Sequence, residues 1–148
     1  MRRIRELQVG PVWPIKRQSY GWEPRVSRIL LADDDTEVRE TVAMVLTDAG
    51  YDVIEALDGD HAVKTYRAKG ADLVVCDLFM PGKDGIETIQ DLRKEFPGVK
   101  IIAMSGSGFN GAVDMLRTAR HLGAIDILGK PVRRAELLAA VERLLAMK

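Results

Sequence analysis

Cysteine, histidine and long apolar runs are scarce in this sequence, and each scarcity excludes a class of protein. One cysteine among 148 residues excludes an intramolecular disulfide framework, and no group of cysteines and histidines has the spacing of a zinc site. No apolar run reaches the roughly 18 residues that a membrane-spanning helix needs. The basic start of the chain is not followed by an apolar stretch, so no signal peptide is visible and a cytoplasmic location is expected.

The net charge is zero, with 22 basic and 22 acidic residues, but the two signs are unevenly distributed. Residues 1–27 hold six Lys or Arg and two Asp or Glu, a net charge of +4. Residues 28–148 hold the remaining 16 and 20, a net charge of −4. An acidic domain does not favour a broad nucleic-acid-binding face, so we expect neither direct DNA binding nor membrane association.

Residues 1–27 differ in composition from the rest of the chain. They contain three of the six prolines and both tryptophans, and they show no sustained helix or strand period. The sequence therefore predicts a poorly ordered N-terminal extension, followed by one domain over residues 28–148. The alternative is a docking segment in which Trp13, Tyr20 and Trp22 anchor a partner.

From residue 28 onward, short apolar runs alternate with amphipathic stretches, which is typical of a parallel sheet with crossover helices. The predicted strands are Ile29–Ala32, Tyr51–Ala56, Leu73–Cys76, Lys100–Met104 and Ala124–Leu128. The predicted helices are Thr36–Ala49, Asp60–Lys69, Gly85–Phe96, Asn110–Leu122 and Arg133–Met147. This alternation predicts an α/β fold, a doubly wound, flavodoxin-like (βα)5 domain with a five-stranded parallel sheet.

Polar residues that could carry chemistry follow four of the predicted strands, at the edge where such sheets bind ligands. They are Asp33, Asp34 and Asp35 after the first strand, Asp77 after the third, Ser105 after the fourth and Lys130 after the fifth. Clustered carboxylates repel one another unless a cation lies among them, and oxygen donors without imidazole or thiolate favour Mg²⁺. A carboxylate can also attack phosphorus to form an aspartyl phosphate, and a neighbouring ammonium and Mg²⁺ would stabilise the transferring group.

Four motifs, LLADDD, CDLFMPGKDG, IIAMSGSG and ILGKP, occur in this order between residue 28 and the C-terminus. In order and spacing they resemble the receiver domain of two-component response regulators, of the stand-alone type. The resemblance implies phosphorelay signal transduction: the domain accepts a phosphoryl group from a sensor histidine kinase, a histidine phosphotransfer protein or acetyl phosphate. It then changes conformation and signals to a partner. Such a domain is not an enzyme with an external substrate, because it catalyses only its own phosphorylation and dephosphorylation.

The resemblance assigns the acidic residues to two roles. Asp77 is the expected phosphoacceptor. Asp33 and Asp34 match the acidic pair that holds Mg²⁺, together with Asp77 and the backbone carbonyl of Phe79. The expected product is therefore a phosphoprotein that carries an aspartyl phosphate beside a magnesium ion.

The resemblance also assigns the residues that respond to the phosphoryl group. Ser105 and Lys130 match the hydroxyl and the ammonium that contact it, and the peptide bond between Lys130 and Pro131 is expected to be cis. The switch position, which is usually aromatic, holds Ile127, so the ring and hydroxyl of the usual rotameric switch are missing here.

Partners follow from the resemblance only in outline. No helix-turn-helix or catalytic output domain follows residues 133–147, so we expect output through an unknown downstream protein. Many relatives form a homodimer through their fourth helix, fifth strand and fifth helix, which here correspond to residues 110–122, 124–128 and 133–147. The sequence leaves this oligomeric state open, along with the cognate kinase.

Two other functions stay open at this stage. One is a degenerate receiver that acts as a phosphorylation-independent interaction module. The other is a phosphatase of the haloacid-dehalogenase kind, which also uses aspartates, a lysine and Mg²⁺. Glu37 stands where those enzymes place Thr or Val, which counts against the phosphatase.

Two residues inside the motifs have structural interpretations. Asp35 is expected to cap the helix that begins at Thr36 and not to bind the metal. Strand alternation turns the side chain of Cys76 away from that of Asp77, so we expect Cys76 to be an inert buried thiol.

Overall fold

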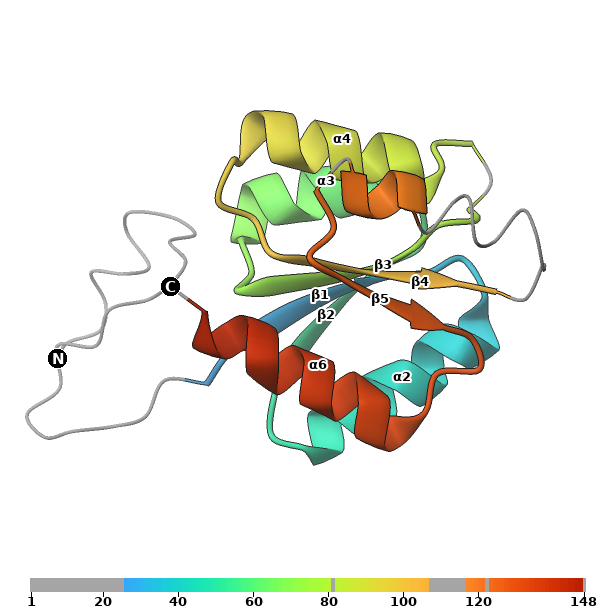
Figure 1. Ribbon diagram of the computed structural model, residues 1–148, viewed down its shortest axis with the longest axis vertical. Coiled ribbons are helices and arrows are strands. Elements are labelled where there is room, and N and C mark those ends of the chain that lie inside the picture. Colours follow the sequence, from blue (N-terminus) through green and yellow to red (C-terminus); the bar gives the residue numbers. More distant parts are fainter. Residues whose placement is uncertain (1–25, 81, 107–116, 122, 148) are drawn as a thin grey trace, which may run out of the picture.

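The computed structural model describes residues 26–80, 82–106, 117–121 and 123–147 (Figure 1). The strands are Arg28–Ala32 (β1), Asp52–Ala56 (β2), Leu73–Asp77 (β3), Ile101–Ser105 (β4) and Asp126–Gly129 (β5). The helices are Thr36–Asp48 (α2), Gly59–Lys69 (α3), Gly85–Glu95 (α4) and Arg134–Ala146 (α6), and residues 117–121 are also helical. The extension over residues 1–25 and most of the predicted helix at 110–122 lie outside the described residues.

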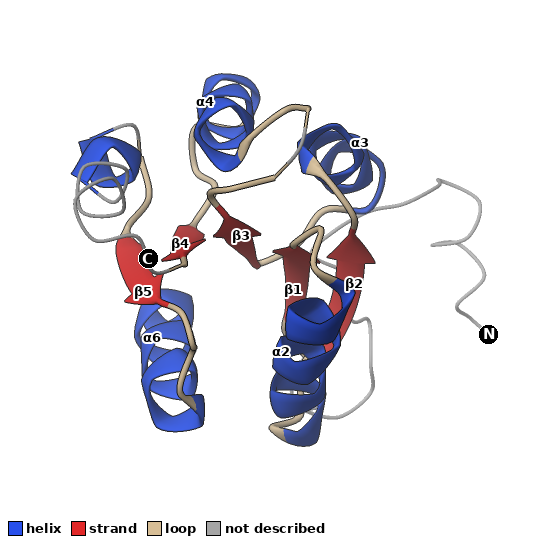
Figure 2. Cartoon of the chain, turned by 90° about the vertical axis from the view of Figure 1, so that its right-hand side faces the viewer, coloured by secondary structure: helices blue, strands red, loops and turns tan. Residues whose placement is uncertain are grey.

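The five strands form one parallel sheet in the order β2-β1-β3-β4-β5. Figure 2 shows α3, α4 and the helical residues 117–121 on one face of this sheet and α2 and α6 on the other. Alternation along β1 places Leu30 in the apolar cluster of the first face and Leu31 in that of the second. Burial on both faces is the reason that the strands read as continuous apolar runs. The predicted doubly wound α/β fold is confirmed.

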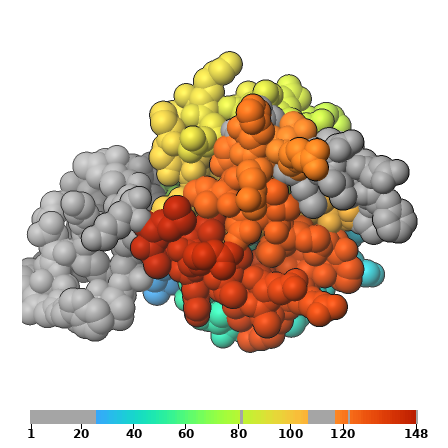
Figure 3. Space-filling view, viewed as in Figure 1, coloured from blue at the N-terminus to red at the C-terminus, as the bar shows by residue number. Residues whose placement is uncertain are grey.

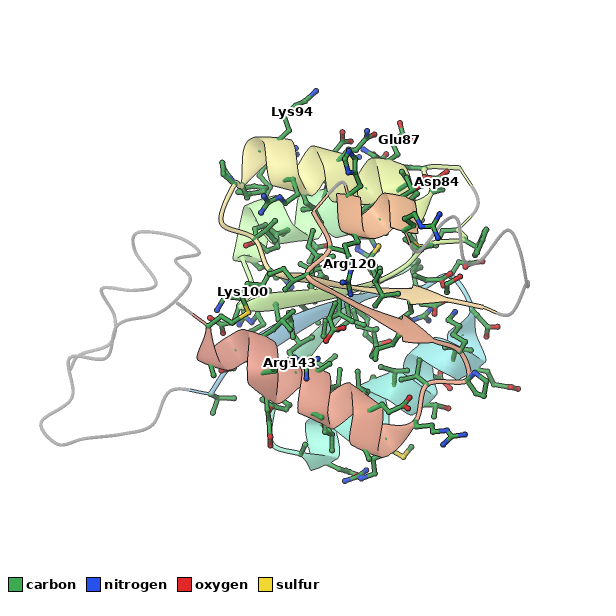
Figure 4. The ribbon with its side chains drawn as sticks, viewed as in Figure 1. Asp84, Glu87, Lys94, Lys100, Arg120 and Arg143 are labelled. Atoms are coloured by element: carbon green, nitrogen blue, oxygen red, sulfur yellow. The ribbon has the colours of Figure 1, made fainter. Side chains whose placement is uncertain are left out.

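Helix α6 packs beside the edge strand β5 and is paired with it through an ion pair. The space-filling view in Figure 3 shows α6 in red and the residues before it in orange covering this face of the molecule. Arg143 of α6, labelled in Figure 4, pairs with Asp126 of β5. At the same, C-terminal end of the helix, Lys100 Nζ donates to the carbonyl of Met147 at 2.6 Å. These contacts hold α6 beside β5, the strand whose carboxyl end leads into Lys130.

Three helices begin at an aspartate whose carboxylate accepts a hydrogen bond from a backbone N–H of the first turn, which satisfies one of the free donors there. The pairs are Asp35 with Val38 (3.2 Å), Asp58 with His61 (2.8 Å) and Asp84 with Glu87 (2.9 Å). The predicted cap at Asp35 is confirmed. Asp84 caps α4 and lies at its N-terminal end in Figure 4.

Two glycines bring the start of α4 against the end of β3 for different reasons. Gly82 has φ +75°, a left-handed conformation that side chains rarely adopt. Gly85 has no such angle, because it is absent from the positive-φ glycines of the described chain. It is required by space, because a Cβ there would lie 2.2 Å from the carbonyl oxygen of Asp77. The helix therefore starts directly against the backbone of the site.

None of the helices described here combines the length and the apolar character that crossing a membrane requires.

Candidate functional site

The acidic residues of the first and second motifs meet at the carboxyl edge of the sheet. Asp33 and Asp34 follow β1, and Asp77 ends the neighbouring β3. One carboxylate oxygen from each of the three lies within 4.8 Å of the others. Asp33 is 0% exposed and Asp77 is 3% exposed, whereas Asp34 is exposed. The site is a buried carboxylate pair with a third carboxylate at its opening to solvent.

Lys130 brings the positive charge to this cluster from the far side of the sheet. Its Nζ lies 2.8 Å from Asp33 Oδ2 and 2.9 Å from Asp77 Oδ1. Its backbone N–H donates to the carbonyl of Ser105 at 2.7 Å, and the peptide bond to Pro131 is cis. One ammonium therefore lies between two buried carboxylates that come from different strands.

One carboxylate oxygen of Asp77, Oδ1, makes no hydrogen bond within the described residues. The approach of Lys130 to Asp77 Oδ1 makes an ion pair without hydrogen-bond geometry, and within the described residues Oδ1 is buried with no hydrogen-bond donor. Such an atom is costly unless another group binds it. Three carboxylates against one ammonium leave an excess of negative charge, and the donors are all hard oxygens. The residues present therefore fit a Mg²⁺ ion.

Burial and charge shift the pKa values of both partners. Loss of hydration raises the pKa of Asp77 to about 6, because the Lys130 ammonium only partly compensates it and the carboxylates of Asp33 and Asp34 add to it. Burial acts to lower the pKa of Lys130, but the hydrogen bond to Asp33 and the contact with Asp77 outweigh it, so this pKa is raised. Lys130 therefore stays charged at neutral pH. Ionisation of Asp77 is less favourable in the folded protein than in the unfolded chain.

The raised pKa of Asp77 predicts how the stability of the metal-free protein depends on pH. The folded-state pKa of Asp77, about 6, lies above its ordinary value of 3.8, so between them the folded protein binds more protons than the unfolded chain. The free energy of unfolding therefore falls as pH rises through this interval. In EDTA, Asp77→Asn should be more stable than the parent by about 3 kcal/mol at about pH 7.5, with most of the gain lost near pH 4. Urea unfolding of both proteins at the two pH values measures this, and a gain that does not change with pH would contradict it.

The other predicted site residues lie in or just after the strands β3, β4 and β5. Ser105 is buried at the end of β4, next to β3 and β5, and its hydroxyl donates to the carbonyl of Gly106 at 3.2 Å. The side chain of Phe79 is 50% exposed, two residues after Asp77. Ile127 is partly buried in β5, opposite Ala103 of β4.

Cys76 lies in the apolar cluster on the α3–α4 face and is fully buried. Burial raises the pKa of its thiol, and the charge of Asp77 raises it further. The thiol therefore stays protonated, and the interpretation of Cys76 as an inert packing residue is confirmed.

Two charged residues that adjoin the cluster, Arg39 and Glu55, were not predicted from the sequence. Arg39 of α2 is 9% exposed; its Nη1 donates to the carbonyl of Asp33 and its Nε to Glu55 of β2, both at 2.9 Å. A signal was present, because Arg39 lies three, four and seven residues before Val42, Ala43 and Leu46, the apolar side of the helix. A charge at such a position needs a partner.

A five-stranded doubly wound domain with an acidic, lysine-containing site at its carboxyl edge defines a class of phosphoryl-accepting signalling domains. Comparison with known proteins agrees: the profile of the response regulator receiver domain matches residues 29–142. The chain belongs to the response regulator receiver domain family.

Relatives and solved structures support this assignment. The chain is 33% identical to the chemotaxis protein CheY of Thermotoga maritima over 117 residues, which cover 78% of this chain and 95% of that one. It is 30% identical to sporulation initiation phosphotransferase F of Bacillus subtilis, covering 82% of this chain and 95% of that protein. The receiver domain of NtrX from Brucella abortus superposes with a TM-score of 0.76 at 29% identity, covering 81% and 99% of the two chains.

Other relatives are longer. The chain is 37% identical to the probable transcriptional regulator ycf27 of Porphyridium aerugineum, but it spans only 48% of that protein's length. What the family shares is the receiver domain: a signalling domain and not a classical enzyme, which generally binds Mg²⁺ at an acidic pocket. Receiver domains interact with histidine kinases or phosphotransfer proteins and with downstream targets. The acidic cluster described above lies within the matched residues.

Proposed function

We propose that this chain is a phosphorylation-dependent receiver whose phosphoacceptor is Asp77. The observation that supports this most is the state of the Asp77 carboxylate: it is buried, and its Oδ1, which lies 2.9 Å from Lys130 Nζ, makes no hydrogen bond within the described residues. A buried carboxylate with a raised pKa is a strained group, and such groups mark functional sites. The proposal includes the cytoplasmic location that the sequence predicts.

In the proposed step, one carboxylate oxygen of Asp77 attacks the phosphorus of a phosphohistidine or of acetyl phosphate. A P–O bond to Asp77 forms while the P–N or P–O bond to the leaving group breaks, and the leaving group keeps the electron pair. Asp33, Asp34, Asp77 and the carbonyl of Phe79 would hold Mg²⁺, which when bound supplies positive charge to the phosphoryl oxygens. The phosphoryl donor stays outside the protein, so no nucleotide site is needed.

Lys130 and Ser105 would report the phosphoryl group to the rest of the domain. The ammonium of Lys130 lies 2.9 Å from the carboxylate that would carry the group, and Ser105 is joined to Lys130 by a backbone hydrogen bond of 2.7 Å. New contacts of these two side chains with phosphoryl oxygens would favour one of two conformations. Because Ile127 lacks an aromatic ring, we propose that the switch uses packing of β5 and not ring rotation.

The partner that donates the phosphoryl group has room to approach beside Lys130. An open groove there is lined by residues 130–132 and by Glu37, Val38, Thr41 and Val42 of α2. We propose that the kinase or phosphotransfer protein contacts this groove while it presents its phosphohistidine to Asp77. The proposal also includes an unknown downstream protein target and a homodimer through residues 110–122, 124–128 and 133–147.

The proposal is tested by intact mass spectrometry after incubation with Mg²⁺ and acetyl phosphate. We expect the protein to gain one phosphoryl group with Mg²⁺ and none with EDTA. Absence of any gain with acetyl phosphate and with a phosphoramidate donor would contradict the proposal and favour the phosphorylation-independent interaction module. Release of phosphate in many turnovers from an external phosphate ester would instead favour the phosphatase.

A further inference from the structure

The buried guanidinium of Arg39 contacts the backbone of the acidic cluster, and it has no role in the proposed phosphoryl transfer. Arg39 Nη1 donates to the backbone carbonyl of Asp33 at 2.9 Å in a buried hydrogen bond. Its Nε donates to Glu55 Oε1 at 2.9 Å, an ion pair in which the Arg39 side chain is 11% exposed. The two bonds use different nitrogens of one planar group, so Glu55 sets the direction in which Arg39 meets Asp33.

The carbonyl that Arg39 binds belongs to the peptide unit between Asp33 and Asp34. Rotation of this peptide unit moves the backbone of Asp34, whose exposed side chain must reach the cluster from outside. The hydrogen bond from Arg39 therefore fixes how the second carboxylate is presented relative to the first.

The remaining polar atoms of Asp33 are held as well. Its N–H donates to the carbonyl of Ala56 at 3.2 Å, its Oδ1 accepts from the N–H of Asp35 at 2.9 Å, and its Oδ2 accepts from Lys130 at 2.8 Å. Arg39 supplies the bond to the one remaining atom, the carbonyl oxygen. Together these bonds hold the residue at the point where the chain leaves β1 and turns into α2.

We infer that Arg39, oriented by Glu55, is a positioning residue that presents the carboxylates of Asp33 and Asp34 to Mg²⁺. The inference rests on the proposed function, because it assumes that these carboxylates bind the ion. A positioning role and a purely electrostatic role predict opposite changes in Mg²⁺ affinity when Arg39 is replaced. A cation near the site repels Mg²⁺, so electrostatics alone predicts tighter binding when the charge is removed. Positioning predicts weaker binding.

The test is the Mg²⁺ affinity of the metal-free protein, followed by backbone amide NMR resonances during titration with MgCl₂. We expect Arg39→Met to bind Mg²⁺ about tenfold more weakly than the parent, the effect of one lost hydrogen bond to a charged group. Glu55→Gln keeps an oxygen acceptor for Arg39 Nε and should lose only about threefold. Arg39→Lys keeps the charge and one donor and should restore part of the affinity.

Arg28 provides a matched control, because its guanidinium also bonds a carboxylate of β2 and a backbone carbonyl. Its Nε bonds Asp52 of β2 at 2.8 Å and its Nη1 donates to the carbonyl of Lys69 at 3.3 Å, at the end of β1 away from the site. Arg28→Met should lower the free energy of unfolding but leave the Mg²⁺ affinity unchanged. Urea unfolding of each variant in EDTA shows whether stability and affinity are separated.

The outcomes distinguish this inference from the function on which it rests. If the parent itself fails to bind Mg²⁺, the proposed function is contradicted, and the role of Arg39 with it. If the parent binds but Arg39→Met and Glu55→Gln bind as tightly or more tightly, only the positioning role is wrong. If Arg39→Met does not fold, the milder Arg39→Lys and Glu55→Gln variants decide, since unchanged affinity in both contradicts the inference.

Discussion

Asp77→Asn is expected to take up no phosphoryl group from acetyl phosphate and Mg²⁺, under conditions in which the parent takes up one. The amide has no ionisable oxygen to attack phosphorus, so the loss should be complete and not graded. Asparagine has nearly the same shape as aspartate, and it removes the charge that burial and the neighbouring carboxylates disfavour. The variant should therefore fold, and intact mass spectrometry compares it directly with the parent.

Asp35→Asn is the control for this experiment. Asp35 belongs to the same acidic run, but its carboxylate accepts from the N–H of Val38 and it is not one of the three clustered carboxylates. Asparagine caps helices about as well as aspartate, so α2 keeps its first turn. This variant should gain one phosphoryl group. Uptake by Asp77→Asn, or loss of uptake in Asp35→Asn, would mean that the acceptor is assigned wrongly.

The sheet and the acidic cluster were predictable because one topological rule connects them. In a parallel sheet the carboxyl ends of neighbouring strands meet at one edge, so polar residues after apolar runs must come together there. Asp33, Asp77 and Lys130 lie tens of residues apart in the sequence, yet the rule places them at one edge, where they are in contact. The order of the strands is not needed for this step.

The boundaries were less predictable because they depend on hydrogen bonds between strands. The predicted third strand ends at Cys76, but β3 includes Asp77, which pairs with Met104 in the ladder. The predicted fifth strand begins at Ala124, but β5 begins at Asp126. Apolar character marks burial, whereas membership of a strand depends on pairing with the neighbour.

Sequence spacing puts Arg39 on the apolar side of its helix, but it does not give the acceptor that Arg39 binds or the reason for Gly85. A bond from Arg39 to a backbone carbonyl leaves no trace in the residue type of its acceptor. The need for glycine at Gly85 comes from the backbone of Asp77, eight residues away, which approaches only when α4 is in place. Both features are three-dimensional contacts of the main chain, which motifs of side chains do not record.

Lys130→Met is expected to destabilise the metal-free protein at neutral pH by about 3 kcal/mol. The side chain of methionine fills similar space, but the buried carboxylates of Asp33 and Asp77 then face each other without the ammonium. Protonation of one carboxylate limits the cost, so the loss should shrink as the pH falls toward the pKa of Asp77, about 6. Because the carboxylates remain, the variant should still bind Mg²⁺, and saturating Mg²⁺ should stabilise it more than it stabilises the parent.

Lys83→Met is the matched control, because the Lys83 side chain is 19% exposed, close to the 16% of Lys130, and its ammonium also contacts two carboxylates. Those carboxylates, on Asp60 and Asp91, are well exposed, so hydration already stabilises their charges and the variant should lose no more than about 1 kcal/mol. Urea unfolding of both variants and the parent, in EDTA and in Mg²⁺, gives the four differences. Equal losses for the two lysines, with equal responses to Mg²⁺, would show that solvent already screens the carboxylates of the site. The ion pair with Lys130 would then not be what holds the acidic cluster together.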